Sequence, residues 1–302
     1  MKIGVSAFAA DAGKSGIGQY VGHLIRRLPR AAPDAQVIVF STRSAARALE
    51  LDGHDLKVVA LPDWLEQPVI SILWHLLLLP VLLLAYGCDV VWLPAGNRRL
   101  GFWYGIPSVG TVHDLAQVHI TDKYDRWRVA YVRRILPRLM RRLTRVVAVS
   151  QATARDLVEH AAVDPGKVTT IHNGFDHTRF LHMNRPAATV AVAEKFGING
   201  PYLLYVARIE HPSKNHVRLL QAFAKLCRQG LSHTLVLAGS RWSGAEAVEA
   251  EVARLGLSDR VIFTGFVANA DLPALYQASD LFVFPSLFEG FGIPPLEAMM
   301  SG

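Results

Sequence analysis

The chain has 302 residues, enough for two domains at about 150 residues each. Apolar residues make up 51% and charged residues 19%, a composition that excludes an intrinsically disordered protein. The two cysteines, Cys88 and Cys227, are too few for a disulfide framework and favour a reducing, cytoplasmic compartment. No Cys/His spacing typical of a zinc site occurs, so neither a metal nor another cofactor is predicted.

The positive charge is concentrated in the first part of the chain. Residues 1–185 carry 23 Lys/Arg and 15 Asp/Glu, a balance of +8, whereas residues 186–302 carry 9 and 10, a balance of −1. We therefore expect the first part either to face an anionic partner or simply to have a basic surface.

Short β-branched runs alternate with amphipathic stretches from the first residues onward. This alternation is typical of a mostly parallel sheet covered by helices, and so of an α/β protein. Strands are predicted at residues 2–8, 36–40, 56–60, 89–93, 108–112, 146–149 and 167–171, with helices at 18–28 and 151–160.

The run from Pro68 to Tyr86 is almost entirely apolar, with 15 apolar residues out of 19. As one helix it would be about 29 Å long, close to the thickness of a bilayer core. However, its flanks, Glu66 and Asp89, lack the Lys/Arg cluster that orients a membrane span. A span would also put neighbouring strands on opposite sides of the membrane. We therefore predict a buried or membrane-surface helix.

A basic amphipathic helix is predicted from Tyr124 to Arg145. It contains eight arginines and a single acid, Asp125, whereas a merely solvated face usually mixes both signs. Such a face suits anionic lipid headgroups, at roughly 1 kcal/mol for each basic residue near the surface. A plain basic surface remains the alternative, and no nucleic-acid-binding signature accompanies the helix.

After a predicted linker at Asn173–Gly200, the alternation starts again. The second block has only four predicted strands, fewer than a doubly wound domain usually has, and the sequence stops at what looks like a helix C-cap. We therefore expect an incomplete second domain. Strands are predicted at 202–207, 234–238, 261–263 and 281–284, with helices at 215–229, 245–255 and 272–278 and another beginning at residues 294–295.

The loop after the first strand, Asp11–Gly18, has three interpretations. Gly13–Ser15 is similar to the end of a P-loop, but Phe8 stands where that motif needs a glycine. The spacing of Gly16, Gly18 and Gly22 fits a dinucleotide fingerprint only loosely. The third interpretation is a glycine-rich loop that lets the backbone approach an anion at a helix N-terminus.

Polar side chains follow several predicted strands, at the edge where open α/β sheets bind ligands. His113 follows the strand at 108–112 and could hydrogen-bond a polar substrate, or merely cap a helix. Arg208 and Lys214 follow the strand at 202–207, where two cations could neutralise a diphosphate. Taken singly, each cation is equally consistent with an ordinary surface charge.

The segment Glu289–Glu297 places two acids, two glycines and a proline pair within nine residues. It lies between a predicted strand and a predicted helix. Its glycines would let backbone N–H groups face an anion at the helix N-terminus. Glu297 could accept two hydrogen bonds from a vicinal diol such as a ribose, and Glu289 could accept one from a sugar hydroxyl.

Together and in chain order, these motifs resemble the retaining glycosyltransferases of family 4. That family has the GT-B fold of two Rossmann-like domains facing a cleft. Glu289–Glu297 is similar to the family's signature of two glutamates separated by seven residues. Val206–His216 resembles the donor-diphosphate segment, and Gly265 and Phe266 lie in what resembles the base-contacting turn. Further similar segments are residues 16–18, 112–115, 149–153 and 172–176.

The resemblance implies an acceptor-side domain at residues 1–180 and a nucleotide-sugar-binding domain at residues 181–302. It implies metal-independent transfer of a sugar with retention at the anomeric carbon. Glu297 would then hold the ribose, while Glu289 positions the donor sugar and His113 hydrogen-bonds it. The loop with Gly16 and Gly18 would face the donor phosphate and the acceptor. The departing diphosphate would be stabilised by Arg208, Lys214 and the backbone amides of Gly290, Phe291 and Gly292.

His211–His216 and the Leu-rich run resemble members that add mannose or a deoxyhexose to lipid-linked polysaccharide precursors. This implies a GDP-sugar donor and a saccharide or lipid-diphosphate-linked acceptor at the inner face of the cell membrane. Family members continue past the position of Gly302. Three rivals remain open: a truncated non-catalytic remnant, a nucleotide-binding protein of another class that uses Lys14, and a relative that epimerises or phosphorolyses a sugar.

Overall fold

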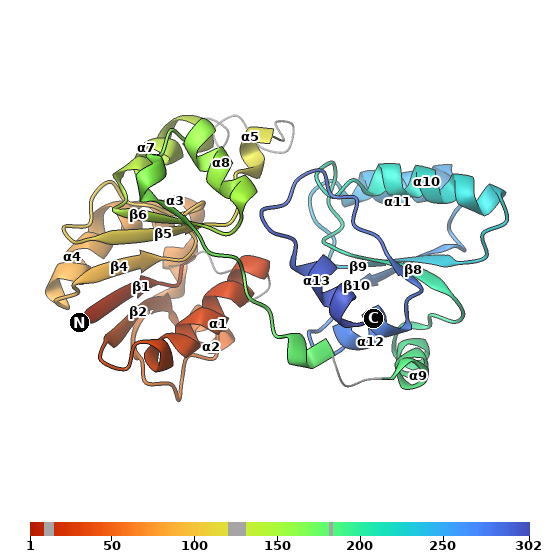
Figure 1. Ribbon diagram of the computed structural model, residues 1–302, viewed down its shortest axis with the longest axis horizontal. Helices are drawn as coiled ribbons and strands as arrows, with labels where there is room; N and C mark the ends of the chain where they lie inside the picture. Colours follow the sequence, from red (N-terminus) through yellow and green to blue (C-terminus); the bar gives the residue numbers. More distant parts are fainter. Residues whose placement is uncertain (9–14, 120–130, 181–183) are drawn as a thin grey trace. The chain divides into compact units, whose positions relative to one another are not determined.

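The computed structural model describes residues 1–8, 15–119, 131–180 and 184–302. The described chain divides into two compact units, Met1–Asn173 and Gly174–Gly302 (Figure 1). The predicted domains meet between residues 180 and 181, seven residues further along the chain.

The first unit is built on a parallel sheet of seven strands in the order β3-β2-β1-β4-β5-β6-β7. The order reverses beside β1, so β1 and β4 flank the switch point at which such sheets bind ligands. All seven predicted strands are therefore confirmed: β1 (Lys2–Ser6), β2 (Gln36–Thr42), β3 (Lys57–Leu61), β4 (Val90–Leu93), β5 (Ser108–Val112), β6 (Arg145–Ala148) and β7 (Val168–Thr170).

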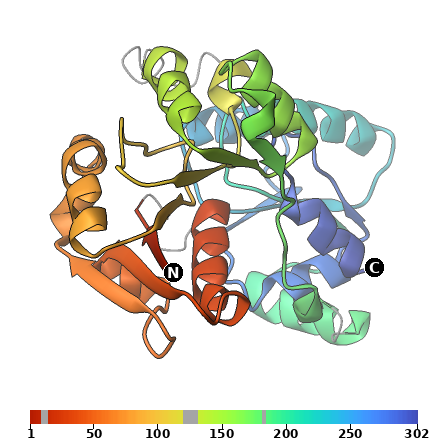
Figure 2. The same cartoon turned by 60° about the vertical axis from the view of Figure 1, so that its left-hand side comes forward.

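Helices cover both faces of this sheet, because the strands of a parallel sheet are buried on both sides. Val37 and Val39 of β2 pack in one core with helix α1 (Gly16–Ala31), and Ile38 and Phe40 pack in a second core on the other face. Figure 2 shows α1 in red on one face, with α7 and α8 in green on the other. Outside the Leu-rich run, the described part of this unit also has α2 (Arg43–Ala48), α5 (Ala116–His119), the π-helical η4 (Tyr131–Ile135), α7 (Leu136–Arg142), α8 (Gln151–Glu159) and the 3-10 turns η2 (Asp63–Glu66) and η5 (Pro165–Lys167).

The Leu-rich run forms three consecutive segments instead of one regular helix: α3 (Pro68–Leu73), the π-helical η3 (Trp74–Leu78) and α4 (Leu79–Ala85). Pro80 lies in the first turn of α4 and has no N–H, which interrupts the regular hydrogen-bond ladder. One side of the run enters the core and the other is exposed. Among the described residues, no helix is both long enough and apolar enough to cross a bilayer.

The predicted basic helix at 124–145 lies partly outside the described residues, since only 131–145 are described. Within that part the prediction runs too far, because α7 ends at Arg142. Arg145 instead begins β6 and pairs with Val109 of β5. The hydrogen bonds between β5 and β6 hold this residue in the sheet instead of in the helix, and helical periodicity in the sequence does not reveal them.

The second unit has a four-stranded parallel sheet in the order β10-β9-β8-β11. This order corresponds to β3-β2-β1-β4 of the first unit. In the second sheet, β8 and β11 flank the switch point. The strands are β8 (Tyr202–Val206), β9 (Thr234–Ala238), β10 (Val261–Gly265) and β11 (Leu281–Phe282). β11 ends two residues before the predicted end, although the Val283 N–H still donates to the Leu204 carbonyl at 2.8 Å.

Helices α10 (His216–Arg228) and α11 (Ala245–Arg254) cover one face of this sheet. Helices α9 (Arg185–Phe196), α12 (Leu272–Ala278) and α13 (Ile293–Met300) cover the other face (Figure 1). A 3-10 turn, η6 (His177–Phe180), precedes α9.

The predicted linker at 173–200 is wrong over much of its length, because it contains α9. Asn184 caps this helix by accepting a hydrogen bond from the Ala187 N–H at 2.9 Å, and Gly197 ends it in the left-handed conformation. Ala188 and Val192 pack in the core with α12. Small buried residues give this helix only a weak apolar stripe, which explains why the pattern was not recognised in the sequence.

Candidate active site

The candidate site of the second unit lies at the switch point of its sheet. The loop after β8 carries Arg208 and Lys214, and the loop after β11 carries Glu289 and leads into α13. Because β8 and β11 are hydrogen-bonded neighbours, both loops leave the same edge of the sheet. Two segments 75 residues apart in the chain are thereby brought together.

Hydrogen bonds hold these two loops in register. The Tyr205 hydroxyl, at the end of β8, donates to the Lys214 carbonyl and also contacts the Ser286 hydroxyl, each at 2.9 Å. The Asn215 side-chain amide donates to the Pro285 carbonyl at 2.9 Å. Burial raises the pKa of Tyr205, so its hydroxyl stays protonated and remains a donor at neutral pH. The loop backbone is thus fixed before any ligand arrives.

Lys214 and Glu289 form an ion pair across the two loops. Lys214 Nζ lies 2.5 Å from Glu289 Oε1, and both side chains are less than one third exposed. The geometry is that of a charge-assisted hydrogen bond, which is shorter and stronger than a neutral one. The sequence placed both residues in the site, and the structure brings them into contact.

Arg208 is held by a residue that sequence reasoning missed. Its Nη2 lies 3.3 Å from Oε2 of Glu210, a carboxylate that is completely buried. Oε1 of Glu210 accepts from the Ser213 hydroxyl at 2.8 Å, which links Arg208 to the residue just before Lys214. Trp242 covers the guanidinium, whose carbon lies 4.8 Å from the ring centroid. One sequence feature could have identified Glu210: it stands two residues after Arg208. Alternate side chains of an extended segment lie on the same side of the backbone, so these two can pair.

His216 is a buried histidine at the start of α10. Its ring lies 4.9 Å from the ring of Tyr205, and its Nδ1–H donates to the Glu210 carbonyl at 3.3 Å. Burial lowers the pKa of His216 to about 4, so the imidazole is neutral at pH 7. His216 therefore supports the loop around Glu210 without adding charge to it.

The start of α13 follows the glycines of the Gly290–Gly292 segment. Gly292 is its N-cap, with a φ of +88° that suits glycine, and no side chain caps this end. Pro294 and Pro295 have no N–H, so the donors at this helix start are the Gly292 and Ile293 amides. Helix N-termini favour negative charge, so the predicted anion contact of the Gly290–Gly292 segment stays a prediction that this geometry allows.

Glu297 lies one turn into α13 and contacts a second residue that sequence reasoning missed, Tyr276 of α12. The Tyr276 hydroxyl donates to Glu297 Oε2 at 2.9 Å. Burial raises the pKa of Glu297, while the bond from Tyr276 and the positive charge of Arg179 act in the opposite direction. Burial and the neighbouring carboxylate raise the pKa of Tyr276, which keeps its hydroxyl a donor.

Gly265 is the last residue of β10, the edge strand beside β9, and Phe266 follows it. Gly265 has a φ of +69°, and Phe266 is 66% exposed. An exposed aromatic ring at the ligand-binding edge of a sheet can stack on a nucleobase. This geometry is compatible with the predicted base-contacting role of the turn.

In the first unit, His113 lies beside the switch point of the larger sheet. Its Nε2–H donates to the Pro94 carbonyl, directly after β4, at 2.8 Å. The Tyr20 ring, from α1, packs edge-on at 4.7 Å between centroids. Burial lowers the pKa of His113, so the imidazole is neutral and its Nδ1 can only accept a hydrogen bond, for instance from a sugar hydroxyl.

The glycine-rich loop is described only from Ser15 onward. Ser15 caps α1 by accepting from the Gly18 N–H at 3.2 Å. Among the described residues, and apart from its chain neighbours and the helix backbone, nothing lies within 4 Å of the position that a Cβ at Gly16 would take. Gly13 and Lys14, on which the P-loop interpretation depends, lie outside the described residues.

Two Rossmann-like units in one chain, with polar residues beside the switch point of each sheet, are the architecture of the GT-B class of glycosyltransferases. The chain belongs to glycosyltransferase family 4. Residues 14–179 match the family model described as Glycosyltransferase Family 4, and residues 192–302 match the model described as Glycosyl transferases group 1. The resemblance seen in the sequence is thereby confirmed.

Several relatives and solved structures are similar to the chain. It is 30% identical over 203 residues to 2-deoxystreptamine glucosyltransferase of Streptomyces kanamyceticus, covering 66% of this chain and 51% of that protein. It is 31% identical over 202 residues to the serotype-specific mannosyltransferase WbdA of Escherichia coli, covering 65% and 24%. The chain thus spans about half the length of these relatives or less. Anabaena HepE in complex with UDP and glucose has a similar fold, with a TM-score of 0.74, 23% identity and coverage of 100% and 78%.

Proposed function

We propose that this chain is a retaining glycosyltransferase that moves a hexose from a nucleotide sugar to a saccharide or lipid-linked acceptor. The observation that carries the proposal is the Lys214–Glu289 ion pair, with Arg208 held beside it, at the switch point between β8 and β11. Residues 181–302 would bind the donor and residues 1–180 would face the acceptor.

Each site residue has a role that its chemistry allows. Negative charge grows on the diphosphate as the bond to the sugar breaks. Arg208, Lys214 and the amides at the start of α13 would stabilise that charge, in the place of a metal ion. Glu289 would accept from a donor-sugar hydroxyl and Glu297 from the ribose diol. His113, through Nδ1, would accept from a sugar hydroxyl.

Calorimetric binding of GDP, UDP and dTDP to the 302-residue chain tests this proposal. We expect selective binding of one base, with GDP favoured on the resemblance to mannosyltransferases; the HepE complexes contain UDP or UDP-glucose. The Lys14→Ala variant distinguishes the proposed donor site from the rival P-loop site. The change would abolish nucleotide binding only if Lys14 contacts the phosphates. Binding of none of the three nucleotides would contradict the donor site and favour a non-catalytic remnant.

The reaction itself is tested with the matching nucleotide sugar. NMR of the product should give the same anomeric configuration as the donor, and addition of Mg²⁺ or Mn²⁺ should leave the rate unchanged. An inverted product would contradict retention. Consumption of the donor without any acceptor would favour the epimerising or phosphorolysing alternative.

We further propose that the first unit docks on an anionic membrane surface. A Leu-rich face, with each side chain at least half exposed, consists of Val69, Leu73, Leu77, Leu78, Val81 and Leu84. A Cβ at Gly105 would touch both Leu84 and Trp103, so this face continues to Trp103. Next to Trp103, Arg142 of α7 lies over the Phe102 ring, 5.7 Å from its centroid. Apolar and aromatic side chains edged by arginines suit a lipid interface.

Sedimentation with vesicles tests this membrane proposal. We expect the Leu77→Gln/Val81→Gln double variant to reduce binding to anionic vesicles several-fold, because each exposed aliphatic side chain contributes buried area in the lipid. Salt should weaken the wild-type protein's binding without abolishing it, because it screens only the arginine contribution. Leu226→Gln, at an exposed site on α10 of the second unit, is the matched control. Equal binding of the double variant and the wild type would contradict the docking face.

A further inference from the structure

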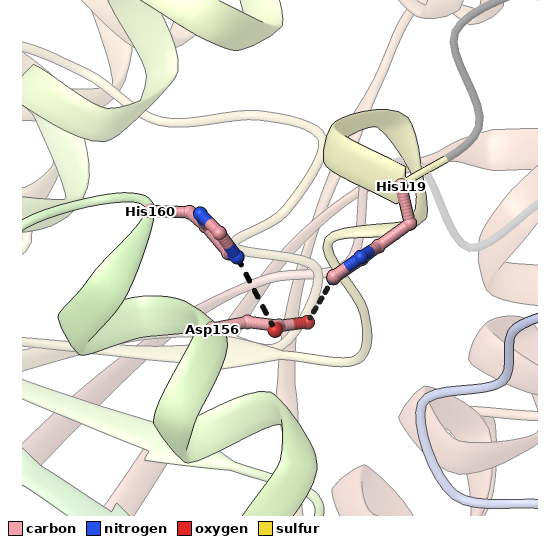
Figure 3. Close-up of side chains that lie close together, drawn as sticks. All are labelled: His119, Asp156 and His160. Atoms are coloured by element: carbon pink, nitrogen blue, oxygen red, sulfur yellow. Dashed lines mark hydrogen bonds and ion pairs between the residues drawn. The ribbon is translucent and has the colours of Figure 1, made fainter.

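Two histidines and one aspartate of the first unit lie close together, and none of the three is assigned to the donor (Figure 3). His119 ends α5, Asp156 lies in α8 and His160 is the C-cap of α8. His119 Nε2 lies 3.0 Å from Asp156 Oδ2, and His160 Nε2 lies 4.0 Å from Asp156 Oδ1. All three ligand atoms lie within 4.8 Å of one another.

Asp156 is a largely buried carboxylate that lies between two imidazoles. Its side chain is 11% exposed, yet among the described residues its ion-pair partners are the two imidazoles, with no lysine or arginine. Burying a carboxylate is costly unless a cation or strong donors compensate it. A metal ion bound by all three side chains would supply that compensation.

The ligand types select the metal. Imidazole nitrogen and carboxylate oxygen together suit Zn²⁺ and related transition ions, whereas Ca²⁺ and Mg²⁺ prefer oxygen ligands alone. Zn²⁺ at about 2.0–2.1 Å from each ligand places neighbouring ligand atoms roughly 3.4 Å apart in a tetrahedron. The observed 3.0 and 4.0 Å lie on either side of that separation. Both imidazoles are more than one third exposed, which leaves them room to adjust.

We propose that His119, Asp156 and His160 bind one Zn²⁺ ion, with water in the fourth position. The ion would join α5, which follows His113 in the chain, to α8, which follows β6. Its role is structural, because these residues are not those assigned to the donor diphosphate or sugar. The proposal is therefore independent of the proposed glycosyl transfer and holds whichever donor is used.

Titration of the tag-free, metal-free chain with Co²⁺, followed by displacement with Zn²⁺, tests this site. We expect one equivalent of Co²⁺ to give the strong visible absorption of a tetrahedral complex, which Zn²⁺ then removes. Calorimetry should show that His160→Gln weakens Zn²⁺ binding by about tenfold or more, because one of three protein ligands is lost. His54→Gln, an exposed histidine of the same unit, should leave the affinity unchanged.

Asp156→Asn provides a second test. We expect it to weaken Zn²⁺ binding at least as much as His160→Gln, with far-UV circular dichroism checking the fold of both variants in the absence of metal. Equal Zn²⁺ affinity in the wild type and His160→Gln would overturn the site, as would a loss of the same size in His54→Gln. Wild-type protein that binds no Co²⁺ or Zn²⁺ would overturn it as well.

Discussion

Replacing Lys214 by alanine is expected to lower kcat/KM for sugar transfer by about 10²–10³-fold. Lys214 Nζ is held 2.5 Å from Glu289 and is only 17% exposed, so its charge acts in a partly desolvated place. There, a positive charge interacts more strongly with a diphosphate than it would in water. Because the diphosphate gains charge in the transition state, kcat should fall, and the loss in nucleoside-diphosphate affinity should be smaller.

Two further variants make this result specific. Lys225→Ala removes an exposed lysine from α10 of the same unit and should change neither kcat nor nucleotide affinity. Glu289→Gln removes the anion that neutralises Lys214. Nucleoside-diphosphate affinity should therefore stay constant or rise, while transfer falls because the acceptor for the donor sugar is weakened.

The different effects of Lys214→Ala and Glu289→Gln on nucleotide affinity distinguish a binding site from a purely structural ion pair. If Lys214 and Glu289 only tied the two loops together, both variants would lower the midpoint of thermal unfolding and nucleotide affinity in parallel. Parallel losses would contradict the assignment of Lys214 to the diphosphate. Such a result would leave the family membership of the chain untouched.

Much of the fold could be predicted because its strands are buried on both sides. The run Val37–Phe40 faces two cores and is therefore continuously apolar, and Tyr202–Val206 behaves in the same way. Such runs stand out in a sequence, and their alternation with helices predicts a parallel sheet. By contrast, the fully buried residues of α9 are Ala188 and Val192, so its sequence lacks a strong apolar stripe and resembles a linker.

The site residues could be predicted from motifs, but their partners could not. Tyr276 belongs to no motif, and Glu210 lies within the motif segment Val206–His216 without an assigned role. Their roles follow from contacts with Glu297 and Arg208, respectively, that the tertiary structure makes. The pair Lys214–Glu289 joins residues 75 positions apart. Local periodicity and spacing contain no information about contacts of that range, except through the rule that ligands bind at the switch point of the sheet.

The second large effect is expected at Glu297. Glu297→Gln should weaken nucleotide-sugar binding by about 10- to 100-fold, because hydrogen bonds to a charged acceptor contribute roughly 1.5–3 kcal/mol. It should also remove a step in the pH dependence of binding. The ionised carboxylate is the form that accepts both hydroxyls of a ribose diol, so wild-type affinity should fall as the pH drops through the pKa of Glu297.

Burial raises the pKa of Glu297, so this loss of affinity should begin at a higher pH than for an ordinary glutamate. Tyr276 acts against the shift, because its hydroxyl donates to the ionised carboxylate. Tyr276→Phe removes that donor and should move the midpoint of the step further upward. Burial lowers the pKa of His216 to about 4, so that imidazole stays neutral over this range, and burial also lowers the pKa of His113 from its ordinary value.

The measurement is calorimetry of an intact nucleotide sugar from roughly pH 8 to 5. An intact donor is required because its diphosphate is esterified at both ends and keeps a constant charge, unlike a free nucleoside diphosphate. Glu194→Gln, an exposed carboxylate on α9, should bind like the wild type at every pH. A pH step that survives in Glu297→Gln, or that fails to move in Tyr276→Phe, would show that another group controls it. The ribose contact would then have to be reassigned, because a carboxylate that binds the diol must lose its affinity when it gains a proton.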